Sequence, residues 1–185
     1  MPIDAAQVKS GLNSRETVVA CRCINVGLFV SDDLRRDVEV SLCIGHDLDL
    51  RIISFSGEKI KRVSPDERSI SFFLLKAMHL LDEMDFGRVR STDNGIVLSR
   101  TNSKDLVTSW STERVHVADR STPTTDWSFV STGGLFVYDI SDVLSRGFTN
   151  SSTSLLHRPQ HPERFILDAN MHCDLLEASL LKKAS

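Results

Sequence analysis

Four basic residues gather in one short stretch of the chain and could bind an anion. They are Lys59, Lys61, Arg62 and Arg68, and the stretch leads into apolar residues at helical spacing. A helix start exposes backbone amides that the helix itself cannot bond. Exposed amides together with cations form a ready site for anions, including phosphate. The residue types therefore predict an anion site at this point of the chain.

A second basic pair, Arg35 and Arg36, lies just before a predicted strand. The planar fork of a guanidinium group matches the oxygens of a phosphate. We therefore interpret these arginines as phosphate contacts rather than as catalytic groups.

The helix that must position the first cluster is predicted over residues 65–84. Ser64 is expected as the N-cap, Pro65 as the first helical residue and Glu67 as the third, which together make a capping box. The apolar residues that follow have the spacing of one buried stripe. They are Ile70, Phe73, Leu74, Ala77, Leu80, Leu81 and Met84.

Elsewhere the pattern alternates between the periods of strands and helices. This alternation predicts an α/β domain with a largely parallel sheet. Without a repeat or an obvious linker, a single domain is expected over residues 1–185. Helices are predicted over 16–30, 106–110 and 171–183, and strands over 37–44, 52–55, 96–98, 115–117, 133–139 and 165–167.

Composition sets limits on function and location. The 185 residues carry a net charge of -3, so RNA binding requires a local patch rather than general basicity. No apolar run reaches membrane-spanning length, and no cluster of histidines and cysteines has metal-ligand spacing. The cysteine spacing indicates reduced thiols, as in an intracellular, cytoplasmic protein. A mitochondrial location, with a presequence that was removed, stays an open alternative. The four cysteines are Cys21, Cys23, Cys43 and Cys173.

Several segments have the order and spacing of one family. With them the chain resembles the archaeal tRNA pseudouridine N1-methyltransferases, which belong to the SPOUT class of knotted RNA methyltransferases. The resemblance extends from about residue 16 to residue 108. Its motifs are Cys21-Arg22-Cys23, Leu34-Arg35-Arg36-Asp37-Val38, the Val-Ser-Pro-Asp-Glu-Arg block of residues 63–68, and the turn from Ser91 to Ile96.

The resemblance implies a reaction, a cofactor and an assembly. Members of the family transfer a methyl group from S-adenosylmethionine to N1 of a pseudouridine in tRNA. They are homodimers, and their C-terminal segment forms a trefoil knot, a rare exception among protein topologies. For this chain we therefore expect a SPOUT-like, mostly parallel sheet with helices on both faces, a C-terminal trefoil knot, and a homodimer that binds tRNA or rRNA.

The implied reaction directs attention to two carboxylates. Pseudouridine N1 must lose a proton as it attacks the methyl group, and a nearby carboxylate could accept that proton or orient the base. Asp37 and Asp66 are the candidates, because both lie beside arginines. A salt bridge for Asp37 and helix stabilisation for Asp66 are the open alternatives. The expected RNA-facing residues are Arg35, Arg36, Lys61, Arg62 and Arg68.

The implied cofactor residues lie in the C-terminal third, where the match is poor. The family has a Gly-Asp-His-like loop, but here Tyr138 replaces the glycine and Ile140 the histidine. A tyrosine adds a side chain where backbone must approach a ligand. A later Ala-Asn-Met-His-Cys segment resembles the family's Ala-Asn-His-Cys at the start of the last helix. The expected cofactor-binding residues are Leu135, Val137, Asp139, His172 and Cys173.

These departures leave two functions open. The first is an S-adenosylmethionine-dependent RNA methyltransferase acting on N1 of a pseudouridine. The rival is a catalytically inactive SPOUT-like RNA-binding or ribosome-assembly factor that kept the RNA surface. From the resemblance we expect no counterpart of the family's leading strand before residue 10, and we expect residues 140–162 to form a divergent loop. A Tyr138 ring buried as core would favour the rival.

Overall fold

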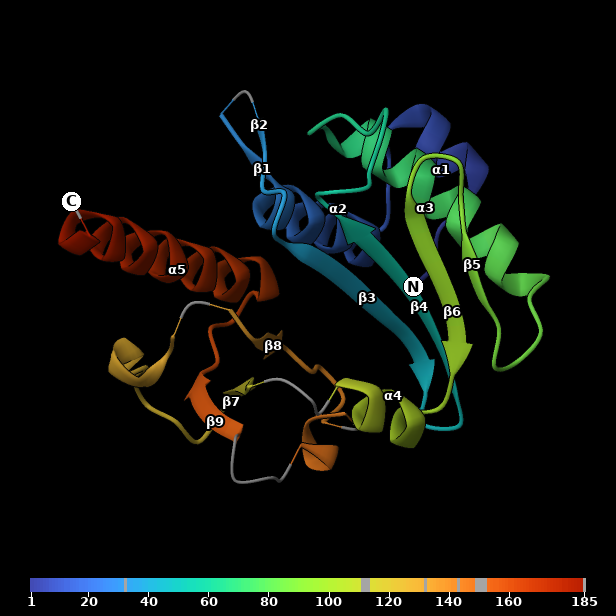
Figure 1. The fold of residues 1–185 in the computed structure, drawn as a ribbon. Helices are drawn as coiled ribbons and strands as arrows, with labels where there is room; N and C mark the ends of the chain where they lie inside the picture. Colours follow the sequence, from blue (N-terminus) through green and yellow to red (C-terminus); the bar gives the residue numbers. More distant parts are fainter. Residues whose placement is uncertain (32, 111–113, 132, 143, 149–152, 185) are drawn as a thin grey trace. The chain divides into compact units, whose positions relative to one another are not determined.

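The chain folds into two compact units, unit 1 (Met1–Asn102) and unit 2 (Ser103–Ser185). Each unit contains both helices and strands, which confirms the predicted α/β class (Figure 1). The single methyltransferase domain expected over residues 1–185 stays a prediction. The computed structural model describes residues 1–31, 33–110, 114–131, 133–142, 144–148 and 153–184.

Unit 1 contains a four-stranded antiparallel sheet with the strand order β3-β4-β6-β5. The prediction of a mostly parallel sheet is therefore wrong for this unit. The physical reason is the short connection between β3 and β4, since His46 pairs with Asp49 across a two-residue turn and parallel strands need a much longer crossover. The strands are β3 (Glu39–His46), β4 (Asp49–Ser56), β5 (Val89–Ser91) and β6 (Ile96–Thr101).

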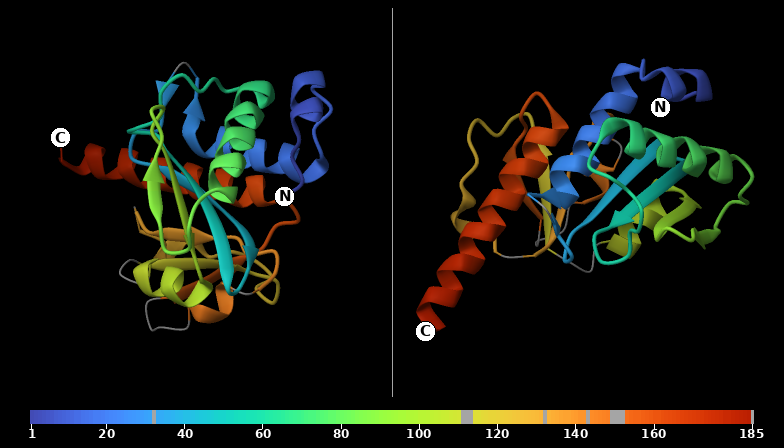
Figure 2. Two further views of the ribbon diagram at one scale, coloured as in Figure 1. Left: turned by 90° about the vertical axis from the view of Figure 1, so that its right-hand side faces the viewer. Right: turned by 90° about the horizontal axis from the view of Figure 1, so that it is seen from above.

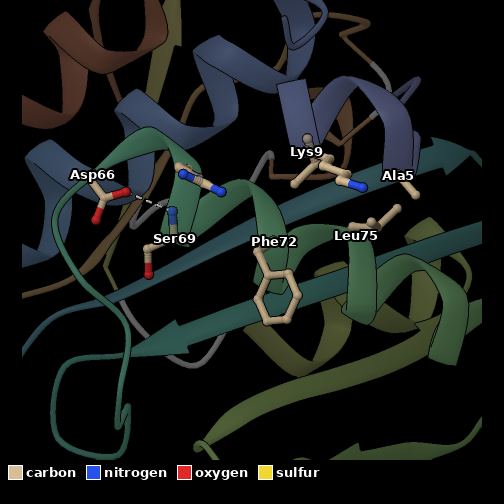
Figure 3. Close-up of a pocket in the computed structure, with 8 residues that line it drawn as sticks. Ala5, Lys9, Asp66, Ser69, Phe72 and Leu75 are labelled. Atoms are coloured by element: carbon tan, nitrogen blue, oxygen red, sulfur yellow. Dashed lines mark hydrogen bonds between the residues drawn. The ribbon is translucent and has the colours of Figure 1, made fainter. Parts of the chain in front are cut away.

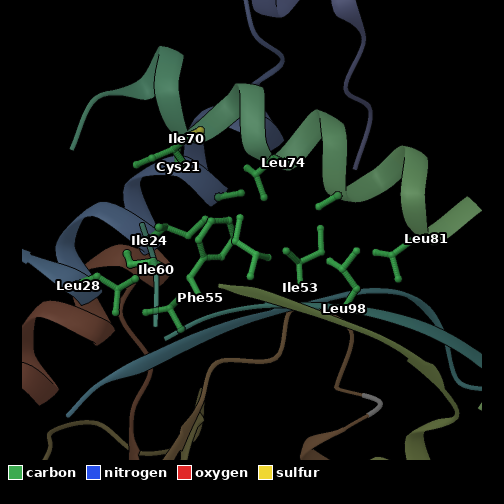
Figure 4. Close-up of a cluster of buried hydrophobic side chains, with 14 of the residues drawn as sticks. Cys21, Ile24, Leu28, Ile53, Phe55, Ile60, Ile70, Leu74, Leu81 and Leu98 are labelled. Carbon is green, nitrogen blue, oxygen red and sulfur yellow. The ribbon is translucent and has the colours of Figure 1, made fainter. Parts of the chain in front are cut away.

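Two helices cover one face of this sheet. Helix α2 (Arg15–Leu28) and helix α3 (Glu67–Asp82) pack against each other and against the strands. Both were predicted from helical spacing and are confirmed. Because they share a face, the predicted arrangement with helices on both faces is not found among the described residues of unit 1 itself (Figure 4). A short helix, α1 (Ala5–Ser10), lies beside α3 (Figure 2).

The core of unit 1 lies between these helices and the sheet (Figure 4). Phe55 of β4 is fully buried against Ile24 of α2 and Leu74 of α3. Burial and the Glu67 charge raise the pKa of the Cys21 thiol, which faces the same core, to about 12. One face of α2, with Ala20, Cys21, Ile24 and Leu28, is thus used inside the unit.

Two further strands form a small hairpin after α2. They are β1 (Phe29–Val30) and β2 (Asp33–Leu34), which pair antiparallel. The helix predicted to run to residue 30 therefore ends at Leu28. The hairpin leads directly into the Arg35-Arg36-Asp37 segment.

Unit 2 contains a three-stranded parallel sheet with the strand order β8-β7-β9. Within this unit both outer strands pair with β7 in the parallel direction, and one mostly parallel sheet for the whole chain stays a prediction. The central strand β7 (Val115–Asp119) was predicted, and so was β8 (Leu135–Val137) within a longer range. The other elements are β9 (Thr153–His157), helix α4 (Ser103–Trp110) and the 3-10 turns η1 (Trp127–Phe129) and η2 (Ser145–Gly147).

The last helix, α5 (Pro162–Ala184), begins much earlier than predicted. The strand expected at residues 165–167 is wrong, because these residues belong to the helix. Phe165 and Ala169 are both buried, and this spacing of four places them on one helical face. Pro162 fits the first helical position, where its missing N–H costs nothing. In the described part of the chain, no helix combines the length and apolar character needed to cross a bilayer.

Candidate functional site

The basic segment before α3 is held against the turn that joins β5 and β6. The Lys61 amide donates to the Asn94 carbonyl oxygen at 2.9 Å. Gly95 has φ 81°, and a Cβ there would lie 2.0 Å from the Lys59 carbonyl oxygen. Arg62 has φ 62°, a conformation that residues with side chains rarely adopt. The packing therefore fixes the path of this segment, and with it the positions of its cations.

Helix α3 starts two residues later than the predicted capping box requires. Asp66 is the N-cap, and its carboxylate accepts a hydrogen bond from the Ser69 amide at 2.8 Å (Figure 3). Ser64 lies outside the helix, and Glu67 is its first residue rather than its third. The predicted box is thus wrong. Serine and aspartate both cap well, but an ionised carboxylate also interacts favourably with the positive end of the helix dipole.

A hollow of about 510 Å³, which we call hollow 1, lies between α1 and α3. Lys9 and Arg68 supply cations to its lining, and Asp66 supplies a carboxylate. Figure 3 shows Lys9 on α1 and the Phe72 ring on α3, with the Asp66 cap at the helix start. The structure thus brings two of the predicted residues, Asp66 and Arg68, to one cavity.

A larger hollow of about 750 Å³, hollow 2, lies on the other side of Phe72. Two predicted residues, Lys61 and Arg62, line it. Lys76 of α3 and Arg90 of β5 line it as well, and the sequence analysis missed both. The positive charges of these two residues are visible in the sequence. Their proximity to Lys61 is not, because residues 61, 76 and 90 come together only in the folded unit.

The predicted Arg35-Arg36-Asp37 cluster lines neither hollow. Arg36 lies 3.8 Å from the Asp33 carboxylate and 3.4 Å from the Gly57 carbonyl oxygen. Asp37 is exposed in a turn, so the salt bridge considered for Asp37 forms at Asp33 instead. The two predicted carboxylates therefore differ: Asp66 caps a helix beside a cavity, and Asp37 faces solvent.

In unit 2, the predicted cofactor residue Asp139 is buried and its carboxylate is fully engaged. It accepts hydrogen bonds from the Ser141 amide and hydroxyl and from the amides of Leu144 and Ser145, at 2.7–3.0 Å. Burial alone would raise the pKa of Asp139, but these hydrogen bonds outweigh it and lower the pKa. Asp139 thus organises its own loop.

The Tyr138 ring takes part in the packing of unit 2. Its hydroxyl donates to the Pro159 carbonyl oxygen at 2.8 Å, and its ring lies 6.0 Å from that of Phe165. The Arg158 guanidinium lies 4.7 Å from the ring centroid and 3.2 Å from the Asp142 carboxylate. These groups meet where the chain leaves β8 and β9, at the carboxyl ends of parallel strands, which is where open α/β sheets bind ligands.

The other predicted cofactor residues also serve the fold. Leu135 and Val137 pair with β7. His172 stacks on Trp127 with ring centroids 5.0 Å apart, and its Nε2 lies 2.9 Å from the Val130 carbonyl oxygen. His172 and Cys173 lie well inside α5, so the prediction that they open the last helix is wrong.

One titratable residue of unit 2, His116, was not singled out by its sequence context. It lies buried on β7, stacks on Phe136, and has Nδ1 2.5 Å from the Ser154 hydroxyl. Its Nε2 is buried with no hydrogen-bond partner in the described residues. Burial lowers the pKa of His116, and the charges of Arg114 and His172 lower it further. Within the described ranges, no group of three or more His, Cys, Asp or Glu residues could hold a metal ion.

Comparison with known proteins identifies the family. A model described as "Putative SAM-dependent RNA methyltransferase" matches residues 8–120, which is more than half of the chain. The chain belongs to this family. The resemblance predicted from the sequence motifs is thereby confirmed. All predicted RNA-facing residues and both carboxylates lie inside the matched segment, whereas the predicted cofactor residues lie beyond it.

Curated relatives carry a more specific name. The tRNA (pseudouridine(54)-N(1))-methyltransferase of Methanococcus aeolicus is 38% identical over 90 residues, which cover 48% of this chain and 43% of the relative. The enzyme of the same name from Methanocorpusculum labreanum is 44% identical over 75 residues, 38% of each chain. The matched segments thus span less than half of these relatives' lengths.

A solved structure resembles the whole chain in fold. Archaeoglobus fulgidus Nep1, solved bound to S-adenosylhomocysteine, aligns with a TM-score of 0.59 and 13% sequence identity, and the alignment covers 95% of this chain and 81% of that chain. At this identity the likeness shows the fold alone. It supports an α/β fold shared with that structure.

Proposed function

We propose that this protein is an S-adenosylmethionine-dependent RNA methyltransferase that acts on N1 of a pseudouridine in tRNA or rRNA. The observation that carries the proposal is the family match over residues 8–120, the segment that also contains every charged residue of both cation-lined hollows. In the reaction, the methyl group passes to N1, the N1 proton leaves, and S-adenosylhomocysteine is released.

Unit 1 is the RNA-binding part in this proposal. Lys61, Arg62 and Arg68 are exposed, and none of them forms an ion pair with another described residue. Unpaired cations can contact phosphates and release condensed counterions, which supplies much of the affinity for nucleic acid. Arg36 is the weaker candidate, because Asp33 lies close to its guanidinium group.

Of the two candidate carboxylates, Asp66 is the one that we assign to interact with the pseudouridine base. It lines hollow 1 beside Arg68, whereas Asp37 lines neither hollow. Only its Oδ1 atom accepts the Ser69 amide. The second oxygen of Asp66 is therefore the one that we assign to accept the N1 proton or to orient the base.

The predicted cofactor residues of unit 2 do not fit a cofactor site as they are arranged. Asp139 bonds four donors of its own loop, and His172 is held by Trp127 and Val130. We therefore assign no step of the reaction to these residues. S-adenosylmethionine supplies the methyl group in the proposed reaction.

A second function is favoured by one observation. The partly buried Tyr138 ring and Arg158 pack against each other at the carboxyl edge of the parallel sheet, and both side chains belong to unit 2 itself. This is the arrangement expected of an inactive relative. In that case the protein would be an RNA-binding or ribosome-assembly factor that uses the surface of unit 1 without methyl transfer.

We also propose that two copies associate and that unit 2 contains the trefoil knot of its family. Support for the dimer comes from α5, where Leu167, Met171 and Leu175 recur every fourth residue and are 38%, 53% and 66% exposed. Support for the knot comes from the parallel sheet of unit 2 and the likeness to Nep1. Light scattering tests the dimer: twice 20.7 kDa is expected, and a monomer contradicts it.

Calorimetry with S-adenosylmethionine separates the two functions. The methyltransferase should bind the cofactor, alone or with a pseudouridine-containing tRNA, and transfer a labelled methyl group to that RNA. Tyr138→Gly should leave or reduce the affinity of an active enzyme, but increase it if the tyrosine blocks the pocket. If the wild-type protein with RNA binds no cofactor, the methyltransferase is excluded and the RNA-binding function stands.

The proposed phosphate contacts of Arg36 and Arg62 are tested by the salt dependence of RNA binding. Each lost phosphate contact should flatten the log–log slope by about one unit. Arg62→Ala should show this change, and Arg36→Ala a smaller one because of its ion pair with Asp33. An unchanged slope in the double variant would show that neither arginine contacts phosphate.

A further inference from the structure

An exposed aromatic ring lies at the centre of the basic surface of unit 1. Arg68, Phe72 and Lys76 are four residues apart along α3, so their side chains follow one line on the helix surface. The Phe72 side chain is 44% exposed although its type favours burial. Phe72 also lines both hollows, so the ring forms the ridge between them.

The charges around this ridge are strongly unbalanced. The linings of the two hollows contain six cations and two carboxylates, in a chain whose net charge is -3. None of the six cations forms an ion pair with a described residue. The surface is therefore complementary to a polyanion. The cations are Lys9, Lys61, Arg62, Arg68, Lys76 and Arg90, and the carboxylates are Asp66 and Asp93.

The exposed Phe72 ring contacts a second ring and a cation. The Phe73 ring meets it at 74°, with centroids 5.5 Å apart. The Lys76 ammonium lies over the ring at 4.5 Å from its centroid, which is a cation–π contact. Since this exposed, flexible side chain reaches the ring face, other groups from solvent can reach it too.

We propose that Phe72 is a stacking platform for an unpaired RNA base, with the cations of hollows 1 and 2 binding the phosphates on either side. An aromatic ring between unpaired cations is the combination by which proteins bind single-stranded nucleic acid, because every base has a face that can stack. The inference rests on the proposed function, since it takes RNA as the partner. It adds that the RNA must offer an unpaired nucleotide to α3.

The test compares two RNA probes and two phenylalanines. The probes are a hairpin with a single-stranded loop and a blunt duplex of equal length. Phe72→Leu keeps apolar volume but removes the ring, and the control Phe86→Leu changes another exposed phenylalanine of unit 1 that lines neither hollow. Phe72→Leu should weaken hairpin binding by about 5- to 150-fold, the range that stacking energies imply. Duplex binding and the salt slope should stay unchanged.

Further variants show what failure would mean. Lys76→Ala and Arg90→Ala should lower the salt slope, and circular dichroism confirms that each variant is folded. If Phe72→Leu leaves hairpin binding unchanged, or weakens it no more than Phe86→Leu, stacking is excluded while the proposed function stands. If the wild-type protein binds neither RNA, both proposals fail. If light scattering shows that Phe72→Leu changes the mass of the protein in solution while its RNA affinity stays unchanged, Phe72 is a contact between two copies and the stacking proposal is overturned.

Discussion

The two units use their polar side chains in opposite ways. Around α3 in unit 1, cations such as Arg62, Arg68 and Lys76 form no ion pair with described residues and line two hollows. In unit 2, Asp139 and Arg158 are engaged within the unit, the first by loop amides and the second by Asp142 and the Tyr138 ring. Polar groups left unpaired at a surface are available to a ligand, whereas satisfied groups mainly stabilise the fold.

This difference coincides with the limits of the family match. The match begins at residue 8 and ends at residue 120, so it covers nearly all of unit 1 and only the first elements of unit 2. The proposed RNA-facing surface therefore lies in the part that the family model matches. Asp139 and Arg158, whose polar groups are engaged within unit 2, lie beyond the matched segment.

The largest effect that we expect is on the core of unit 1. Phe55→Ala should lower the free energy of unfolding by about 3–5 kcal/mol, because a fully buried ring is lost and a cavity remains. Far-UV circular dichroism is the suitable measurement, since both tryptophans and the only tyrosine lie in unit 2. Val89→Ala is the control: this residue of the same sheet is 70% exposed, and its loss should cost less than about 0.5 kcal/mol. Equal losses would contradict the assigned core.

Much of unit 1 could be predicted from the sequence, because its elements follow local rules. The helical spacing from Ile70 to Met84 and the alternation from Val38 to Ile44 both correspond to observed elements. Strand direction was not predicted correctly, because pairing depends on connections. The short turn between His46 and Asp49 makes β3 and β4 antiparallel. The sequence analysis inferred strand direction from the alternation of strands and helices and therefore missed this turn.

The site was predicted only where its residues are close in the sequence. Lys61, Arg62 and Arg68 form one local cluster, whereas Lys9 and Arg90 join them only in the folded unit. Phe72 lies off the predicted apolar stripe of the helix, but helical spacing does not show that the cations of two hollows surround its ring. In unit 2, the family motif pointed to residues that the fold uses for packing.

A smaller effect is expected from the Asp139 loop of unit 2. Asp139→Ala leaves three amides and a hydroxyl without their acceptor. Such a loss should lower the free energy of unfolding by about 1–3 kcal/mol, measured by the fluorescence of Trp110 and Trp127. Ser141→Ala removes only one of these donors and should cost less. If Asp139→Ala costs no more than Ser141→Ala, the loop does not depend on the carboxylate.

The Asp66 cap should contribute about 1 kcal/mol, and it offers a way to separate two roles. Asp66→Ala removes both the cap and the carboxylate, whereas Asp66→Ser keeps a capping oxygen and removes the charge. Circular dichroism should therefore show a loss for Asp66→Ala that Asp66→Ser largely restores. If Asp66→Ser restores methyl transfer to the same extent as it restores stability, the carboxylate only caps the helix. Persistent loss of transfer in a stable Asp66→Ser protein would support its role toward the base.

The most limited effect should appear only on the acid side of neutrality, at His116. Burial lowers the pKa of this side chain below its ordinary value of 6.5, so the unfolded chain binds a proton at a higher pH than the folded one. The free energy of unfolding of unit 2 should therefore fall as the pH decreases through 6.5 toward the lower folded pKa. His116→Gln cannot take up this proton, so tryptophan fluorescence should show a flatter pH profile for the variant. Parallel profiles for the two proteins would mean that the ring titrates as freely in the folded unit as in the unfolded chain.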